Sequence, residues 1–287
     1  VQAGKFKIAT GIPTLLALQQ LLDPSRADKV WVQLREGQRL DPLIITALSK
    51  GTKLPVADLK AYLSDTSPTD AGLPAWIPAK ATETAFEGAL FPDTYEVPEG
   101  TTAKSIVKTI AAQFKAVTDN MDFYNAAQKL DFGPKYAAAT AEEKAYMALT
   151  VASIIEREVS RAEDRPKVAR VIYNRLAKGM ALELDSTVAY AVGKNDSIFT
   201  SVDDRKSASG YNTYLNPGLP PGPISAPGEA ALSAAINPEA GDWLYFMPVN
   251  LDTGETAFTS TLAEHNAARA QFQAWCTASE ANAAKCK

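Results

Sequence analysis

Apolar residues recur at three- and four-residue spacing through residues 141–180, which is the period of an amphipathic helix. The pattern predicts two helices in this region. The first contains ALTVASIIEREVS, where Ala148 and Ile155 belong to one core face. It ends on two acidic side chains, Glu156 and Glu158, directly after the apolar run. The sequence therefore predicts a buried helix with carboxyl groups at its C-terminal end.

The second predicted helix runs through RPKVARVIYNRLAK. Ser160 followed by Glu163 has the spacing of a capping box, in which each side chain bonds the other residue's backbone N–H. Gly179 follows the last apolar position, where glycine commonly ends a helix. We therefore expect this helix to begin near Ser160 and to end at Gly179.

Residues 1–66 contain two similar short units, each a strand-like run followed by a helical pattern. The first is AGKFKIATGIPTLLALQQLL. The second alternates apolar and polar residues from Val30 to Leu34, which is typical of a strand with one buried face. Asp41 and Pro42 are predicted to open the helix that follows, as its cap and first residue. We interpret the two units as a weak internal repeat.

Residues 67–135 are predicted to form an irregular connector and a helical linker. The connector includes FEGALFPDTYEVPEGTT, interpreted as two proline-containing turns, and Thr101 or Thr102 then caps a helix. From residue 136 onward helices dominate, with two short strands, WLYFMPV and ETAFTS, around a DTG turn. The whole pattern predicts an α+β fold in which small β–α units precede a mainly helical domain.

Composition narrows the possible functions. Of the 287 residues, 46% are apolar and 22% are charged, as in soluble globular proteins. The formal charge of −4 argues against nucleic acid and against adhesion to an anionic membrane, since both require a basic surface. No apolar run approaches the roughly 18 residues of a membrane span. Because the chain opens at Val1 without an initiator methionine, we interpret it as an excised portion of a longer protein.

Two cysteines, Cys276 and Cys286, lie ten residues apart near the C-terminus. No cluster of histidines or further cysteines accompanies them, so a metal site is not expected. Two free thiols and one disulfide that closes a small terminal loop remain open alternatives.

The two acids at the helix end differ in their predicted surroundings. Glu156 lies about 100° round the helix from Ile155, at the edge of the core face and on one stripe with Ser153. Partial burial would raise its pKa and keep it protonated, as a general acid requires. Glu158 lies about 200° further round, within reach of Arg161, and is expected in solvent or in an ion pair. A plain surface role for both acids is the alternative.

Other catalytic chemistries have little support. His265 is the single histidine, and it lies within a predicted helix without a serine nucleophile motif elsewhere. The glycine-rich segment GLPPGP carries prolines where a phosphate-binding loop needs backbone N–H donors.

Five segments occur in an order that resembles the YceG-like (MltG) endolytic murein transglycosylases. They are FEGALFPDTYEVPEGTT, TVASIIEREV, RPKVARVIYNRLAKGMALELDST, YNTYLNPGLPPGPISAPG and TSTLAEHN. The N-terminal units resemble the LysM-like portion of that family. The resemblance implies LysM-like units at 1–66, the first of them truncated, a connector at 67–135, and a lysozyme-like catalytic domain with a short β-hairpin at 136–287.

The resemblance also implies an activity. Members of this family cut peptidoglycan glycan strands internally and leave a 1,6-anhydro-muramyl end. Their catalytic glutamate matches Glu156, which would protonate the glycosidic oxygen and then accept the proton of the sugar's C6 hydroxyl. No metal or cofactor is implied. The implied setting is the outer face of the cell membrane, with an N-terminal membrane helix absent from this chain and cell-wall synthases as partners.

Tyrosine rings suit sugar faces and amides suit N-acetyl groups, so the loop YNTYLNPGLPPGPISAPG is interpreted as a cleft lining. A rigid supporting loop is the alternative. Asp185 and Thr187 match a family DPT motif in which Ser186 here replaces proline. The residues predicted to bind substrate are Ser153, Asp185, Thr187, Tyr211, Asn212, Thr213, Tyr214, Pro221, Gly222, Ile224, Asn237, His265 and Asn266.

Two other functions remain open at this point. The same glutamate could drive hydrolysis in a muramidase, with Asp185 or another carboxylate positioning water. Alternatively, the chain could be a non-catalytic glycan-binding scaffold in a cell-wall synthesis complex.

Overall fold

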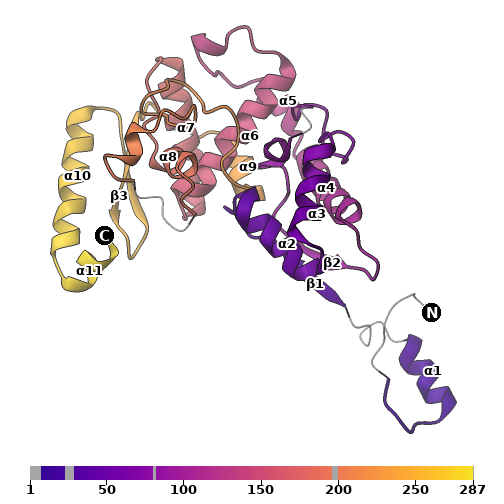
Figure 1. The fold of residues 1–287 in the computed structure, drawn as a ribbon. Helices are drawn as coiled ribbons and strands as arrows, with labels where there is room; N and C mark the ends of the chain where they lie inside the picture. Colours follow the sequence, from indigo (N-terminus) through magenta and orange to yellow (C-terminus); the bar gives the residue numbers. More distant parts are fainter. Residues whose placement is uncertain (1–7, 23–28, 80–81, 196–199, 287) are drawn as a thin grey trace.

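The computed structural model describes residues 8–22, 29–79, 82–195 and 200–286 (Figure 1). Most of the predicted first strand lies outside these residues. Helix α1, Thr14–Leu22, is described, and it lies apart from the rest of the molecule (Figure 1). None of its residues is buried. The rest of the described chain is mainly helical, with two small antiparallel sheets, so the mixed α+β prediction is confirmed.

The first sheet joins β1, Val30–Gln33, to β2, Thr94–Val97. Within the alternating run, Val32 and Leu34 are buried as predicted, but Val30 is 45% exposed. Strand β2 was not predicted, because its segment was interpreted as turns. The sheet therefore connects residues of the predicted N-terminal units with residues of the predicted connector.

Three helical elements follow β1: the π-helical turn η2, Leu40–Ile44, then α2, Ile45–Thr52, and α3, Val56–Asp65. The predicted capping role of Asp41 is wrong. Its backbone is extended inside η2, and its carboxylate forms an ion pair with Lys60 instead. A tertiary contact thus takes the side chain that local sequence assigns to the helix end.

The linker region packs tightly. Thr102 caps α4, Ala103–Asn120, through a capping box with Ser105, which confirms one of the two predicted caps. Trp76 from the connector stacks against Phe123, with ring centroids 5.7 Å apart. The remaining elements before residue 140 are η3, Glu83–Phe86, α5, Phe123–Ala127, and η4, Pro134–Tyr136.

Helix α6, Ala141–Glu158, runs through the centre of the molecule (Figure 1). It is preceded by Thr140, whose hydroxyl forms a capping box with Glu143. Its flanking elements are η5, Ala162–Asp164, α7, Arg165–Ala177, α8, Asp185–Ala191, η6, Asp204–Lys206, and α9, Glu229–Ile236.

The predicted capping box of Ser160 and Glu163 is wrong. The short turn η5 intervenes, and α7 begins at Arg165. Glu163 pairs with Arg161, its neighbour across the turn, rather than with a helix end. The predicted stop is confirmed, since α7 ends at Ala177 and Gly179 follows with a φ of +65°.

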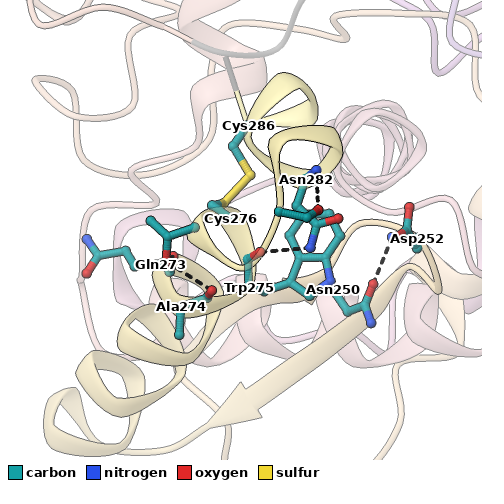
Figure 2. The surroundings of a disulfide bond; sticks show 10 residues. Asn250, Asp252, Gln273, Ala274, Trp275, Cys276, Asn282 and Cys286 are labelled. Carbon is teal, nitrogen blue, oxygen red and sulfur yellow. Dashed lines mark hydrogen bonds between the residues drawn. A yellow bond between two sulfur atoms is a disulfide. The ribbon is translucent and has the colours of Figure 1, made fainter.

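The C-terminal part contains the predicted hairpin and helix, namely β3, Tyr245–Asn250, β4, Glu255–Thr259, and α10, Leu262–Thr277. A further helix, α11, Glu280–Lys285, was not predicted. A disulfide joins Cys276 at the end of α10 to Cys286 after α11 (Figure 2). Of the two alternatives for these cysteines, the structure has the disulfide.

One hydrophobic cluster extends from Val32 near the N-terminus to Ile236 in α9. The N-terminal sheet, the linker and the central helices therefore share a core. Within the described ranges, we find no helix that is both long enough and apolar enough to cross a membrane.

Candidate active site

Glu156 occupies the last turn of α6, a helix that is apolar on several sides. The loop before α9 packs against this turn. Its side chain is only 6% exposed. Oε1 lies 3.0 Å from Nη2 of Arg165, the first residue of α7, whose side chain is 10% exposed. Oε2 accepts a hydrogen bond from the backbone N–H of Gly228 at 3.0 Å. The predicted position at the edge of the core face is confirmed.

Burial raises the pKa of the Glu156 carboxyl above its ordinary value. The Gly228 N–H and the cations Arg165 and Arg157 oppose this rise, while the negative charge of Glu36 adds to it. The balance is a raised pKa, so a larger fraction of Glu156 is protonated near neutral pH than of an exposed glutamate. Glu156 can therefore donate a proton and, once ionised, accept one.

The prediction for Glu158 is wrong. Its Oε1 is excluded from solvent and has no hydrogen-bond partner, and Arg161 pairs with Glu163 instead. Burial raises the pKa of Glu158 to about 7, a rise that Ser186 in the first turn of α8 limits. Helix geometry alone could not show that α8 packs over this side of α6.

The loop from Gly222 to Gly228 lies along α6 and is fixed by hydrogen bonds. Ile224 donates its N–H to Oγ of Ser153 at 3.0 Å, and the Ser225 hydroxyl donates to the Ser153 carbonyl at 3.0 Å. Ser153 has no exposed surface. Its role in this structure is to hold the loop whose last residue, Gly228, reaches Glu156.

A second buried carboxyl, that of Glu87, was missed in the sequence. It is 4% exposed and accepts hydrogen bonds from the Leu40 N–H at 3.0 Å and the Tyr190 hydroxyl at 3.1 Å. Burial raises its pKa to about 7, although both donors and the charge of Arg39 lower it. Tyr211 packs on Tyr190, with ring centroids 4.6 Å apart. The available signal was an acid within the apolar run AFEGALF.

Gly222 is a residue of the loop that lies close to two tyrosines, Tyr146 and Tyr211. A Cβ at Gly222 would lie 2.6 Å from the hydroxyl oxygen of Tyr146 and 3.4 Å from that of Tyr211. Only glycine allows the loop to approach these rings so closely. Pro221 beside it is exposed, whereas Ile224 is 2% exposed.

Asp185 forms several hydrogen bonds, one of them with Tyr214 of the predicted lining. Its Oδ1 accepts hydrogen bonds from the Tyr214 hydroxyl at 2.9 Å and the Thr200 hydroxyl at 2.7 Å. Arg205 binds both carboxylate oxygens, with its Nη2 2.8 Å from Oδ2. Four donors thus hold this carboxylate in place.

Three further predicted residues are buried and hydrogen-bonded within the protein. The hydroxyls of Thr187 and Thr213 lie 2.8 Å apart, and Thr213 also accepts from the Leu184 N–H. The Asn212 amide donates to the carbonyls of Arg205 and Ser207. Their contacts support the alternative of a rigid loop framework.

The last three predicted residues lie elsewhere. His265 stacks on Tyr245 of β3 at 5.0 Å, and burial lowers its pKa, as do Arg175 and Arg269. Asn266 is exposed on α10. Asn237 ends α9 and lines a cavity of about 430 Å³, together with residues that include Arg170, Tyr173 and Asn174. Glu156 does not line that cavity.

Comparison with known proteins identifies the family of this chain. The YceG-like family profile matches residues 1–271. The chain belongs to the YceG-like family.

A curated relative from Bacillus subtilis, named endolytic murein transglycosylase, is 33% identical over 280 residues, which are 94% of this YceG-like chain and 73% of the relative. A second protein of that name, from Streptococcus pneumoniae, is 34% identical over 185 residues, which are 63% of this chain and 31% of the relative.

A YceG-like protein of Listeria monocytogenes has a similar solved structure, with a TM-score of 0.70 and 32% identity. The match covers 88% of this YceG-like chain and 80% of the other. The mixed helix-and-sheet fold is therefore shared with that protein. The finer LysM-like and lysozyme-like assignments stay predictions, as does the division into three domains.

Proposed function

We propose that this YceG-like chain is an endolytic peptidoglycan transglycosylase that cleaves the MurNAc–GlcNAc bond of nascent glycan strands. The relatives named endolytic murein transglycosylase support the class of reaction. The observation that carries the proposal is the Glu156 carboxyl, which is 6% exposed and has a raised pKa beside the fixed N–H of Gly228.

In the proposed reaction, protonated Glu156 donates its proton to the glycosidic oxygen as the C1–O bond of the MurNAc residue breaks. The C6 hydroxyl oxygen of the same sugar bonds to C1. Its proton passes to the Glu156 carboxylate, which restores the acid. The products are a free hydroxyl on the leaving strand and a 1,6-anhydro-MurNAc end, and no water is consumed.

Arg165 and the Gly228 N–H suit the second half of this cycle, because they stabilise the carboxylate that forms once the proton has left. Asp185 is a poor candidate for a water-activating base, since Arg205, Tyr214 and Thr200 occupy its carboxylate. We also propose that the protein acts at the outer face of the cell membrane, anchored by a segment outside this chain, alongside cell-wall synthases.

The test is mass spectrometry of the products that the wild-type protein makes from uncrosslinked glycan strands. We expect internal cleavage and new ends lighter by one water than reducing ends. Reducing ends would show a muramidase. Binding of strands without any cleavage would favour a scaffold.

A further inference from the structure

The turn Glu36–Gly37, just after β1, is inserted beside the catalytic candidate. Gly37 donates its N–H to the Ala226 carbonyl, and Ala226 donates to the Gln38 carbonyl, both at 2.8 Å. Arg157, the residue after Glu156, donates from Nη1 to the Gly37 carbonyl at 3.2 Å. The turn is thus fixed to the loop before α9 and to the end of α6.

This attachment places the Glu36 carboxylate directly against Gly228. A Cβ at Gly228 would lie 1.9 Å from Oε1 of Glu36, so the oxygen occupies the space that any other side chain would need. The N–H of the same glycine bonds Oε2 of Glu156 at 3.0 Å. Two carboxyl groups, from residues 120 positions apart in the chain, therefore flank one glycine.

The two carboxyls differ in exposure. Glu36 is exposed to solvent, whereas the side chain of Glu156 is 6% exposed. Within the described part of the chain, Glu36 has neither a hydrogen bond nor an ion pair through its carboxylate. Its negative charge adds to the rise in the pKa of Glu156.

We infer that Glu36 is a positioning residue of the active site, whose negative charge acts together with burial to hold Glu156 in its protonated form at the start of the reaction. This inference rests on the proposed role of Glu156. Ionising Glu156 would place two like charges about a single glycine, which is unfavourable. Glu36 itself transfers no proton. The same repulsion favours the return of the proton from the C6 hydroxyl.

The other groups that face Glu156 act in both directions. Arg165 from α7, Arg157 from α6 and the Gly228 N–H favour the carboxylate, whereas burial and Glu36 favour the acid. Without Glu36, the cations and the N–H would have only burial against them. The N-terminal turn thus supplies a negative charge that opposes the arginines, of which Arg165 has the larger effect.

The test compares the wild type with Glu36→Gln, which keeps the shape of the side chain and removes its charge. Carboxyl carbon NMR, with the Glu156 signal assigned by its loss in Glu156→Gln, reports the titration directly. The alkaline limb of the cleavage rate against pH reports it a second time. Glu229→Gln, which removes an exposed charge next to Gly228 in the sequence, is the matched control.

In Glu36→Gln we expect Glu156 to titrate at lower pH and the alkaline limb to move the same way. Each pH unit of movement lowers the rate on the alkaline side about tenfold, while the rate at lower pH stays near that of the wild type. Glu229→Gln should leave both curves in place. Unchanged curves in Glu36→Gln would overturn the inference.

Gly228→Ala provides a second variant, in case Glu36→Gln does not fold. The backbone of Gly228 is extended, with a φ of −78°, so alanine is allowed there and must push the exposed Glu36 carboxylate aside. We expect the same direction of change in both curves, and an unchanged titration would contradict the inference. Absence of cleavage by the wild type at every pH would refute the proposed function alone, since the NMR titration needs no activity.

Discussion

Glu87, Glu156 and Glu158 are carboxyl groups whose pKa is raised by burial, and they differ in the donors that reach them. Glu87 accepts from a backbone N–H and a tyrosine within the protein. Glu158 has an oxygen without any partner. Glu156 alone of the three pairs with an arginine, Arg165, at the hydrogen-bonding distance of 3.0 Å. These contacts support the proposal that Glu156 is the proton carrier.

Sequence reasoning placed Glu156 at the edge of the core face, because that position depends on the periodicity of its own helix. Its catalytic role was implied by the family resemblance and stays a prediction. Sequence reasoning missed Glu87 and misplaced Glu158 because their surroundings come from other segments. Leu40 and Tyr190 lie 47 and 103 residues from Glu87 in the chain. Ser186 of α8 limits the rise in the pKa of Glu158. Burial of this kind is set by tertiary packing, which local spacing does not encode.

Glu87 makes stability depend on pH. Its pKa is about 7 in the folded protein against an ordinary 4.5, so the folded state holds an extra proton between these values. The free energy of unfolding should therefore fall as pH rises through this window, by up to about 3 kcal/mol from this group, and then level off. Glu87→Gln should remove that part of the slope, since an amide does not ionise.

Urea denaturation between about pH 5 and about pH 8 measures this dependence. The exposed Glu239→Gln is the matched control and should follow the wild type. An equal slope in wild type and Glu87→Gln would show that Glu87 does not ionise in this window.

The elements near the site were predicted with unequal success. Helix α6 and the hairpin of β3 and β4 follow from clear periodicity and turn residues. The start of α7 did not, because Arg161 takes Glu163 away from its predicted capping role. Strand β2 was missed because its partner β1 lies more than 60 residues away in the chain. Because the pairing spans that distance, the local sequence of the four residues of β2 does not indicate a strand.

Helix α11 is held to the molecule mainly through α10. The disulfide joins the two helices, and the Asn282 amide donates to the Trp275 carbonyl at 2.9 Å (Figure 2). Lys285 also pairs with Asp252. A bond that closes so short a loop contributes about 3 kcal/mol at most against the unfolded chain. Its local effect is to keep α11 docked.

Reduction of Cys276–Cys286 should therefore release α11 and leave the catalytic region intact. We expect faster hydrogen exchange confined to residues 278–286 and an unchanged rate of glycan cleavage. The double variant Cys276→Ser/Cys286→Ser should behave like the reduced protein. Loss of cleavage on reduction, with α6 still protected, would show that the C-terminal helices contribute to the site.

On the scale of the whole molecule, the N-terminal region from β1 onward and the central helices pack against each other. They share one hydrophobic core, and the Gly37 turn and Glu87 both reach residues of the second half of the chain. The sequence predicted separate units along the chain, but it could not show that the turn Glu36–Gly37 lies beside Gly228 and Glu156. The proposed mechanism therefore includes this N-terminal turn.

The measurement that tests this account most directly is the initial rate at which anhydro-MurNAc ends form from uncrosslinked glycan strands. Three proteins are compared: the wild type, Glu156→Gln, and Glu158→Gln as the matched change at the same helix end. Glu156→Gln should lose about 10²- to 10⁴-fold in rate while remaining folded and able to bind strands. Glu158→Gln should retain cleavage. Wild-type rates in Glu156→Gln would contradict the central claim.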